Sequence, residues 1–346
     1  MTKWDKDYLK LCKRILSEGV EVENRTGVNT IKVPSHHFEF DLESELPILT
    51  TKQLFFKNAI TELLWIYQVQ SNDVRWLQER NNPIWDEWEI SEDGKWRATQ
   101  MLPDENGKLV KKDIEKDFGK EWAHTIGTAY GWIVREYNQI DKLIDKIKHN
   151  PTDRRMIINL WQNAHLDTAV LPSCVWSSEW DVTDGHLNAW VHQRSCDVPL
   201  GLPFNVTQYS VLLYLLAHVT DLKPGTLNWS IKDAHIYVNQ IEGIKEQIRR
   251  EEEYEYFSRC DKDYVQMALD QTKEEMDKIE DKKSKEYLKL DSRYKMLDMI
   301  LNPEKPELWL NPEVKDFYEF DNSRELKDIK ILKYKHMGKI NIPIAQ

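Results

Sequence analysis

The residues of this chain that are best suited to chemistry are one cysteine and a set of arginines. Cys174 follows Pro172-Ser173 at the start of a strand-like segment. A nucleophilic thiol needs a group that lowers its pKa and an electrophile to attack. Arg154-Arg155 and the segment Gln193-Arg194-Ser195-Cys196-Asp197 supply cations, and guanidinium groups also bind phosphate through paired hydrogen bonds. This combination predicts a nucleophilic cysteine that acts on an anionic substrate.

Two polar segments further along the chain are suited to recognising such a substrate. Asn205 precedes a long apolar run, and its carboxamide presents one donor and one acceptor, which can match N3–H and O4 of uracil. His235 and Tyr237 lie two positions apart in a strand-like segment, so their side chains share a face and can bind a sugar hydroxyl. Each motif also has a plainer interpretation: a buried structural thiol at Cys174, arginines on a solvated face, an N-cap at Asn205, and half-buried residues at His235 and Tyr237.

Helices and strands that would hold these residues are visible as hydrophobic patterns. Apolar residues at helical spacing predict helices at 1–19, 54–70, 137–148 and 205–222, the last buried and ended by Pro224-Gly225. Alternating or β-branched runs predict strands at 30–40, 156–160, 173–182, 186–193, 228–231 and 235–237, with Asp184-Gly185 as a hairpin turn. Closing strands are predicted at 308–310, 314–318 and 329–334. Turn residues, tryptophans and charges mix over 81–120, which predicts a long irregular connection.

A charged helical stretch with few breakers runs from Gln247 to Asp298. Sparse apolar positions among Glu and Lys are typical of a solvated helical hairpin, with an interaction arm as the alternative. No internal repeat and no low-complexity linker is visible. The sequence therefore predicts a single α+β catalytic domain over residues 1–346, in which a mixed β-sheet packs against helices, with a charged helical insertion at 249–303.

The composition of the 346 residues limits the classes of protein to which the chain can belong. Hydrophobic residues make up 40% and aromatic residues 11%, which indicates a folded protein. The net charge of −11 disfavours a general nucleic-acid binder, although a few arginines in one cleft can still attract an anionic small molecule. No signal-peptide core or membrane-length apolar run is present. The four cysteines form no CxxC pair, so we expect reduced thiols, no metal site and a cytoplasmic location.

The order of the motifs resembles that of the thymidylate synthase family across nearly the whole chain. The resemblance excludes parts of the 96–125 connection and the charged stretch between Ile248 and Pro306. The motifs that carry it are Arg25-Thr26-Gly27, Thr50-Thr51-Lys52, Glu62-Leu63-Leu64-Trp65, Ile84-Trp85-Asp86-Glu87-Trp88, Asp153-Arg154-Arg155, Pro172-Ser173-Cys174, Gln193 to Asp197, Leu200 to Asn205, and Asp233 to Tyr237.

The resemblance implies a site for dUMP. Cys174 is expected to attack C6 of the base and make C5 nucleophilic, with Glu62, Tyr130, Asp197 and Arg194 as the other catalytic residues. Glu62 would organise water and proton transfers near O4, and Tyr130 would help to remove the C5 proton. The expected nucleotide-binding residues are Arg25, Arg194 and Ser195 for the phosphate, Asn205 for the uracil edge, His235 and Tyr237 for the ribose 3′-hydroxyl, and Arg154 and Arg155 reaching over from the partner subunit of a homodimer.

The resemblance also implies a site for 5,10-methylenetetrahydrofolate as cosubstrate. The residues expected to line it are Ile84, Trp85, Trp88, Leu171, Asp197, Gly201 and Phe204. The C-terminal Ile344-Ala345-Gln346 would close over the bound folate and exclude water before hydride transfer. Neither a membrane nor a specific nucleic acid is expected as a partner.

Several positions depart from the usual family pattern. Val175 replaces the common His after the nucleophile, Glu179 replaces a Gln, and Tyr130 stands in an unusually apolar run. Related pyrimidine-nucleotide hydroxymethylases share the missing His, and they quench the intermediate with water in place of hydride. Some synthases look similar at Pro172-Ser173-Cys174-Val175 and over 309–318. The sequence thus predicts reductive methylation of dUMP to dTMP, with dUMP hydroxymethylation and a non-catalytic nucleotide-binding protein as alternatives.

Overall fold

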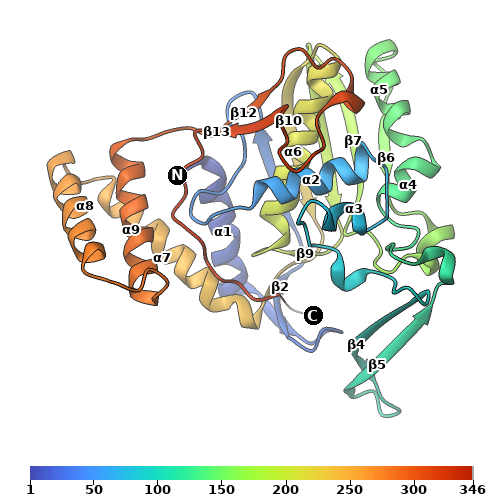
Figure 1. Ribbon diagram of the computed structural model, residues 1–346, viewed down its shortest axis with the longest axis horizontal. Coiled ribbons are helices and arrows are strands. Elements are labelled where there is room, and N and C mark those ends of the chain that lie inside the picture. The colour runs from blue at the N-terminus through green and yellow to red at the C-terminus, as the bar shows by residue number, and fades with distance from the viewer. Residues whose placement is uncertain (345–346) are drawn as a thin grey trace.

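The computed structural model describes residues 1–344, and its centre is a five-stranded mixed sheet (Figure 1). The strand order is β3-β10-β8-β7-β6, in which β10 pairs parallel with β8 and every other pair is antiparallel. The strands are β3 (His36–Asp41), β6 (Ile157–Asn159), β7 (Val175–Thr183), β8 (His186–Gln193) and β10 (Lys223–Ile231). Asp184 and Gly185 both have positive φ in the β7–β8 turn, which confirms the predicted hairpin.

Side chains of this sheet alternate between a packed face and an open face. In β8, Leu187, Ala189 and Val191 are buried, whereas Trp190 between them is 45% exposed. The packed face is covered by α6 (Gly201–Val219), and α2 (Phe56–Tyr67) packs on α6 (Figure 1). Helix α6 is apolar around most of its circumference because it lies between the sheet and α2.

A second, four-stranded sheet carries several of the predicted site residues. Its order is β1-β2-β11-β9, and β9 and β11 run parallel. The strands are β1 (Val20–Val22), β2 (Thr30–Val33), β9 (Cys196–Asp197) and β11 (Ala234–Tyr237). Helix α1 (Lys3–Glu18) packs on β2 and β11, and a capping box of Thr2 and Asp5 begins it. The α+β fold predicted from the sequence is confirmed.

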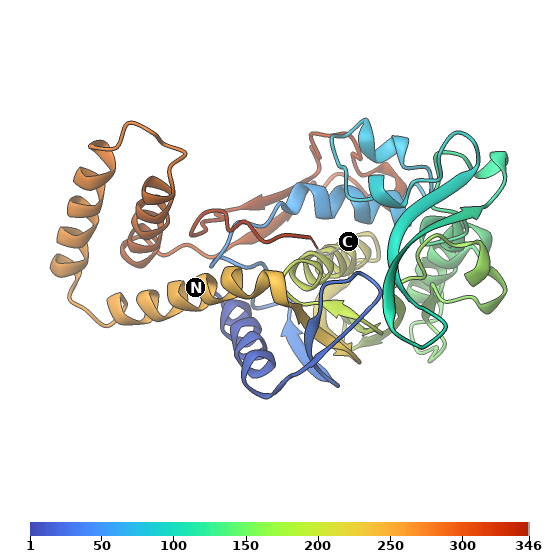
Figure 2. The same ribbon diagram turned by 90° about the horizontal axis from the view of Figure 1, so that it is seen from below.

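A long β-hairpin projects from the molecule where the sequence predicted an irregular connection. Strands β4 (Lys95–Pro103) and β5 (Leu109–Asp117) pair antiparallel along their full length. The hairpin stands at one end of the molecule (Figure 2). Its strands carry few buried residues, so the apolar alternation that indicates a strand is weak. The prediction of an irregular 81–120 segment is therefore wrong over 95–117.

Shorter elements connect these parts. The remaining helices before the central hairpin are α3 (Arg75–Gln78), α4 (Gly131–Glu136) and α5 (Gln139–His149). The 3₁₀ helices are η1 (Asp86–Trp88), η2 (Lys120–Trp122), η3 (Asn163–Thr168), η4 (Val238–Gln240) and η5 (Phe317–Glu319). Helix α5 ends before the turn that carries Arg154 and Arg155.

Three helices form an arm at the opposite end of the molecule from the β4–β5 hairpin (Figure 2). They are α7 (Ile241–Phe257), α8 (Lys262–Asp277) and α9 (Lys285–Leu301). The arm has an apolar cluster of its own, which includes Phe257, Met296, Leu297 and Met337. Helix α7 is continuous across residue 249, where the sequence analysis began the insertion, so the proposed boundary lies within one helix.

The chain then returns to the body through an antiparallel pair, β12 (Glu307–Leu310) and β13 (Ile329–Leu332). A third closing strand predicted at 314–318 is wrong. The side chain of Asp316 accepts a hydrogen bond from the Tyr318 backbone N–H at 2.8 Å, which fixes a turn and the short η5 helix. Helix α6 ends at Val219 and Asp221 has φ of 55°, so Pro224-Gly225 lies in β10 and does not end the helix.

Candidate active site

Cys174 lines a pocket of about 1250 Å³ and lies directly before β7. Its backbone N–H donates to the Tyr130 hydroxyl at 3.3 Å, and Nη2 of Arg194 is 3.9 Å from its Sγ. Burial raises the pKa of the Cys174 thiol, and the charges of Arg194 and Arg25 act in the opposite direction. The predicted nucleophile therefore has two cations close enough to stabilise its thiolate.

Arg194 is held in place by the chain around the nucleophile. Its Nε donates to the Ser173 carbonyl at 3.0 Å, and its Nη2 donates to the Pro172 carbonyl at 2.7 Å. The guanidinium carbon also lies 5.4 Å from the centre of the Trp161 ring, a cation–π contact. These contacts use only part of the guanidinium, so its remaining N–H groups are available to an anion in the pocket.

The pocket brings together residues from six separate parts of the chain. Predicted site residues that line it are Arg25, Trp88, Leu171, Cys174, Arg194, Ser195, Asp197, His235 and Tyr237. The β4–β5 hairpin forms one wall with side chains that the sequence analysis did not single out, among them Trp96, Met101, Lys111 and Lys116. The backbone N–H of Met101 donates to the Arg25 carbonyl at 2.8 Å, so the hairpin also supports the Arg25 loop.

His235 and Tyr237 share one face of β11, as their spacing predicted, with ring centres 5.2 Å apart. Nδ1 of His235 is 2.8 Å from an oxygen of Asp233, whose other oxygen accepts from Lys32 at 2.8 Å. Burial alone would raise the pKa of Asp233, but the hydrogen bonds from His235 and Lys32 lower it to about 2. A charged Asp233 fixes the His235 ring in the pocket wall.

Asn205 is part of a continuous chain of side-chain amides beneath the pocket. Its Oδ1 accepts from Gln193 Nε2 at 3.2 Å, and its Nδ2 donates to Gln208 Oε1 at 3.1 Å. Gln193 in turn accepts from the indole N–H of Trp229 at 3.0 Å. The plainer interpretation of Asn205 as an N-cap is wrong, because α6 begins four residues earlier at Gly201.

Glu62 ends this chain of amides. Gln208 Nε2 donates to one Glu62 oxygen at 2.6 Å, and the indole N–H of Trp85 donates to the other at 2.7 Å. Burial raises the pKa of Glu62 to about 7, although the bonds from Trp85 and Gln208 favour the carboxylate. A carboxyl group that titrates near neutrality is suited to both giving and taking a proton.

The aromatic residues beside Glu62 pack on one another. Trp85 has its ring centre 5.6 Å from that of Trp88 and 5.0 Å from that of Tyr130. Burial raises the pKa of Tyr130 well above its usual range, so its hydroxyl is protonated at neutral pH. Ile84, next to Trp85, is half-buried against the core.

Asp197 lines the pocket and lies next to the start of α6, whose Gly201 and Phe204 do not line it. Asp197 Oδ1 accepts from the Leu200 N–H at 3.1 Å, and its Oδ2 accepts from Gln240 Nε2 at 3.1 Å. Burial raises the pKa of Asp197. Gly201 and Phe204 lie in the first turns of α6, and the added Cβ of a larger residue at Gly201 would lie 3.8 Å from Asp197. Ala345 and Gln346 lie outside the described residues.

Arg154 and Arg155 are not part of this pocket. Both are exposed in the turn between α5 and β6, and the Arg155 side chain is 85% exposed with its Nε bonded to Asp153 at 3.0 Å. Val175 and Glu179, the two positions of β7 at which the sequence departs from the usual family pattern, lie on opposite faces of the sheet. Val175 is buried, and Glu179 lies on the open face, 2.9 Å from His192 Nε2. Glu179 is therefore remote from the chemistry of the pocket.

Besides the hairpin side chains, the sequence analysis missed Gln208, Trp229, Trp161 and Gln240. Gln208 lies three residues after Asn205, so helical spacing alone places it on the same face of α6. The other three reach the site only through tertiary contacts.

Within residues 1–344 no cluster of His, Cys, Asp and Glu has the arrangement of a metal site, and no helix is long and apolar enough to cross a membrane. All four cysteines are free thiols.

Comparison with known proteins decides the family. A family model described as thymidylate synthase matches residues 6–291. A thymidylate synthase of Clostridium beijerinckii is 41% identical over 345 residues, and thymidylate synthase 1 of Bacillus subtilis is 33% identical over 364 residues; each comparison covers 100% of both chains. The chain belongs to the thymidylate synthase family.

The fold agrees with this family. The structure of the thermostable thymidylate synthase A from Bacillus subtilis matches with a TM-score of 0.70 and 32% identity, covering 100% of both chains. The prediction of a thymidylate synthase, a methyltransferase, is therefore confirmed, and none of these matches supports the hydroxymethylase alternative. Thymidylate synthases use 5,10-methylenetetrahydrofolate as their cosubstrate.

Proposed function

We propose that Cys174 is the nucleophile with which this thymidylate synthase methylates dUMP. The observation that carries the proposal is the 3.9 Å approach of Arg194 Nη2 to Sγ of Cys174 inside the large pocket. One cation can thus serve both the thiolate and the nucleotide phosphate. Attack of the thiolate on C6 of the base makes C5 nucleophilic, and loss of the thiolate at the end of the reaction restores the double bond.

The other nucleotide contacts follow from where each side chain lies. Arg25, Arg194 and Ser195 line one region of the pocket and would hold the phosphate. His235 and Tyr237 lie on β11 at its wall and would bind the ribose 3′-hydroxyl. Asn205 would read the uracil edge with the second hydrogen of its NH₂ and the second lone pair of its carbonyl oxygen.

Proton handling would fall to the buried residues next to the base. Glu62 has a pKa of about 7 and is linked to Asn205 through Gln208, so it would organise proton transfer near O4. The Tyr130 hydroxyl lies at the backbone of Cys174 and would assist removal of the C5 proton. Both groups are shielded from bulk water, which strengthens their interactions with the base.

The pocket has room for the folate beside the nucleotide. Its volume of about 1250 Å³ exceeds the range of about 300–1000 Å³ that is typical for one ligand. Trp88 and Leu171 provide apolar surface for a planar ring, with Trp85 and Ile84 behind them. Asp197, whose pKa is raised by burial, would bind N–H groups of the pterin, with Gly201 and Phe204 beside it. The C-terminal segment Ile344-Ala345-Gln346 would close over the bound folate.

The test of this function is a product assay with purified protein, dUMP and 5,10-methylenetetrahydrofolate. We expect dTMP by chromatography and an equal amount of dihydrofolate by absorbance, because hydride transfer oxidises the tetrahydrofolate. Cys174→Ser should give neither product. Consumption of dUMP without dihydrofolate, giving the 5-hydroxymethyl nucleotide, would contradict the proposal.

We also propose that the active protein is a homodimer in which Arg154 and Arg155 enter the partner's phosphate site. The open face of the five-stranded sheet supports this, because it exposes Trp176, Trp190 and Ile157 by 38%, 45% and 47%. Aromatic residues that are exposed in a row on a sheet mark an interaction surface. The arginine turn directly precedes β6, the edge strand of that sheet. The cytoplasmic location stays a prediction, supported by the free thiols.

Mixing two inactive variants tests the shared site. One variant carries Arg154→Ala and Arg155→Ala, and the other carries Cys174→Ser. Each alone should be inactive or nearly so. After dissociation and reassociation, about a quarter of wild-type activity should return, because half of randomly formed dimers are mixed and each has one intact site. No recovery, in a mixture shown by mass spectrometry to contain mixed dimers, would refute the exchange of arginines.

A further inference from the structure

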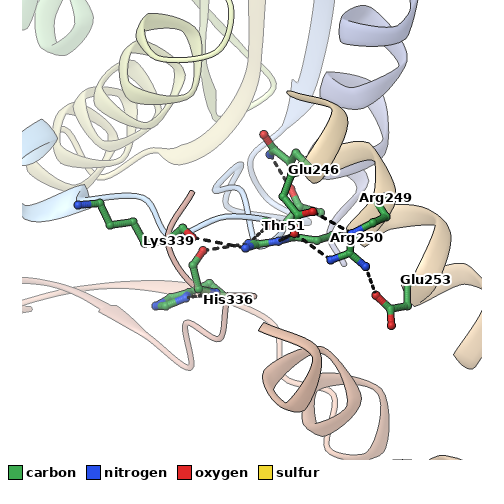
Figure 3. A network of polar contacts seen from close by, with 9 residues as sticks. Thr51, Glu246, Arg249, Arg250, Glu253, His336 and Lys339 are labelled. Atoms are coloured by element: carbon green, nitrogen blue, oxygen red, sulfur yellow. Dashed lines mark hydrogen bonds and ion pairs between the residues drawn. The ribbon is translucent and has the colours of Figure 1, made fainter. Parts of the chain in front are cut away.

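The last part of the chain is attached to the body by a buried arginine of the arm. Arg250 on α7 is only 5% exposed, and its guanidinium faces three backbone carbonyls (Figure 3). Nη1 donates to the Thr51 carbonyl at 3.0 Å and to the Gly338 carbonyl at 3.1 Å, and Nη2 donates to the Lys339 carbonyl at 3.4 Å. Nε donates to Glu246 at 3.1 Å. A buried guanidinium that binds carbonyls of two distant segments joins them.

Backbone pairing and apolar packing reinforce this attachment. The Met337 N–H donates to the Thr50 carbonyl at 2.8 Å, and the Gln53 N–H donates to the Gly338 carbonyl at 2.9 Å. The Met337 side chain is fully buried in the apolar cluster of the arm. Gly338 has φ of 82°, so the chain turns sharply where Arg250 binds it. The arm therefore fixes the direction in which the C-terminal segment leaves this point.

Both segments that Arg250 joins continue toward Asp197, which lines the pocket. Beyond Gly338, the Pro343 carbonyl accepts from Gln240 Nε2 at 3.2 Å, and the same amide donates to Asp197. Beyond Thr51, the ammonium of Lys52 is bonded to the Pro199 carbonyl, directly before α6. Residues 337–343 thus run from the arm to the side of the pocket assigned to folate.

We propose that Arg250 is a positioning residue for the C-terminal segment, and that the arm serves folate-dependent turnover through it. The proposal rests on the proposed function, because the segment is assigned to closing over the folate. The sequence analysis interpreted residues 247–298 as a solvated helical hairpin. The proposal adds a role for this arm, because the arm also packs on the C-terminal segment. Arg250 does not line the pocket that contains Arg25 and Arg194, so binding of dUMP should not depend on it.

Arg249 provides a matched control in the next position of the same helix. It donates to Glu246 at 2.8 Å and to Glu253 at 2.6 Å, and its side chain is 38% exposed (Figure 3). Its hydrogen bonds go to carboxylates of its own helix, in contrast to the carbonyls bound by Arg250. Arg250→Met and Arg249→Met each remove one guanidinium and one net charge from α7, and only the former releases the C-terminal segment.

Two measurements on the full-length protein separate a positioning role from a structural one. The first is the rate at which carboxypeptidase Y shortens the chain, followed by intact mass. The second is a kinetic comparison of dUMP binding with the KM for 5,10-methylenetetrahydrofolate and kcat. For Arg250→Met we expect about tenfold faster shortening, about tenfold higher folate KM and lower kcat, since several hydrogen bonds to a charged group are lost. The Kd for dUMP should stay within about twofold of wild type.

Arg249→Met should match wild type in both measurements. The proposal fails if folded Arg250→Met is shortened by carboxypeptidase Y at the wild-type rate and has the wild-type folate KM. It also fails if Arg249→Met changes the shortening rate and the folate KM as much as Arg250→Met does. Should Arg250→Met not fold, Arg250→Lys takes its place, because it keeps the charge and lacks the planar guanidinium that bonds the three carbonyls. The same criteria then apply. If wild type makes no dTMP, the proposed function fails, and the shortening rates still decide whether Arg250 holds the segment.

Discussion

The guanidinium of Arg194 lies 3.9 Å from the thiol of Cys174 and is bonded to the carbonyls of the two preceding residues, Pro172 and Ser173. The turn that carries the nucleophile thus also fixes its cation. Since this geometry exists in the free protein, the cation does not have to be recruited by the substrate.

Arg194→Met should make Cys174 less reactive by raising its pKa further. Burial already raises the pKa of this thiol, and Arg194 is the first of the two charges that oppose the shift. We expect alkylation of Cys174 by iodoacetamide to move to higher pH, with about tenfold slower reaction at pH 8 for each unit of further shift. Peptide mass spectrometry over a pH series measures the rate, and Cys260 in the same digest serves as the internal control. An unchanged profile would show that Arg194 does not act on the thiol.

5-Fluoro-dUMP with 5,10-methylenetetrahydrofolate should trap a covalent complex on Cys174. Fluorine at C5 cannot leave as a cation, so the reaction stops after carbon transfer. Intact mass should show the adduct, and peptide mapping should place it on Cys174 and on none of Cys12, Cys196 or Cys260. Cys174→Ser should abolish it, because a hydroxyl has too high a pKa to replace the thiol. An adduct at another cysteine would show that this other cysteine, and not Cys174, is the nucleophile.

Glu62→Gln should change how stability depends on pH. The pKa of Glu62 is raised from 4.5 to about 7 in the folded state, so the folded protein holds this proton more tightly than the unfolded chain. Stability from this group is complete below pH 4.5 and is lost as pH rises through 7. Between pH 5 and pH 8 the free energy of unfolding of wild type should therefore fall by about 2 kcal/mol relative to that of the variant.

Urea unfolding at both pH values measures this difference. Glu92→Gln removes an exposed carboxylate near η1 and is the control. An equal effect of Glu62→Gln at both pH values would mean that Glu62 does not titrate in this range. The pH profile of kcat should also lose a titration near neutrality in Glu62→Gln.

Trp229→Phe should weaken the discrimination between dUMP and dCMP. The indole N–H of Trp229 can only donate, so it fixes the orientation of Gln193 and, through it, of Asn205. Without it Gln193 can reverse, and Asn205 is then held in the orientation that suits uracil by Gln208 alone. We expect the ratio of Kd values for dCMP and dUMP to fall about fivefold to tenfold, the equivalent of one hydrogen bond. Isothermal titration measures both affinities.

Trp180→Phe is the matched control for that change. Trp180 is buried in the same sheet, and its N–H donates to Ser178 at 3.0 Å, with no link to Asn205. It should leave the nucleotide ratio unchanged. Equal loss of discrimination in both variants would point to a general loosening of the sheet.

Local patterns were sufficient for most of the fold because the core elements have strong periodicity. The hairpin turn at Asp184-Gly185 and the buried α6 are examples of such signals. The β4–β5 hairpin was missed because both its faces are largely solvated, which leaves charged residues where alternation would be expected. A turn signal was present in Asn106-Gly107, where Gly107 has φ of 80°.

The start of α6 was misplaced for a different reason. The helix was expected to begin at Asn205, but it begins at Gly201, and Pro203 is compatible with the first turn, where its missing N–H has no helical partner. Asn205 therefore lies inside the helix, where its side chain can join Gln193 and Gln208. The motifs identified part of the pocket lining, including Arg25, Cys174 and Arg194, but Glu62 and Asn205 do not line the pocket. Partners such as Trp229 and Gln240 depend on contacts between segments that no local pattern contains.

The chain of amides between Trp229 and Trp85 has a consequence for attempts to change the base that this enzyme accepts. The amides end at the Trp229 indole, which can only donate, and at the Glu62 carboxyl, which accepts from both Gln208 and Trp85, so their orientation is set from both ends. A substitution at position 205 alone would leave Gln193 or Gln208 with a mismatched partner. Redesign of base preference would therefore have to start in the hydrophobic core and proceed outward to the pocket.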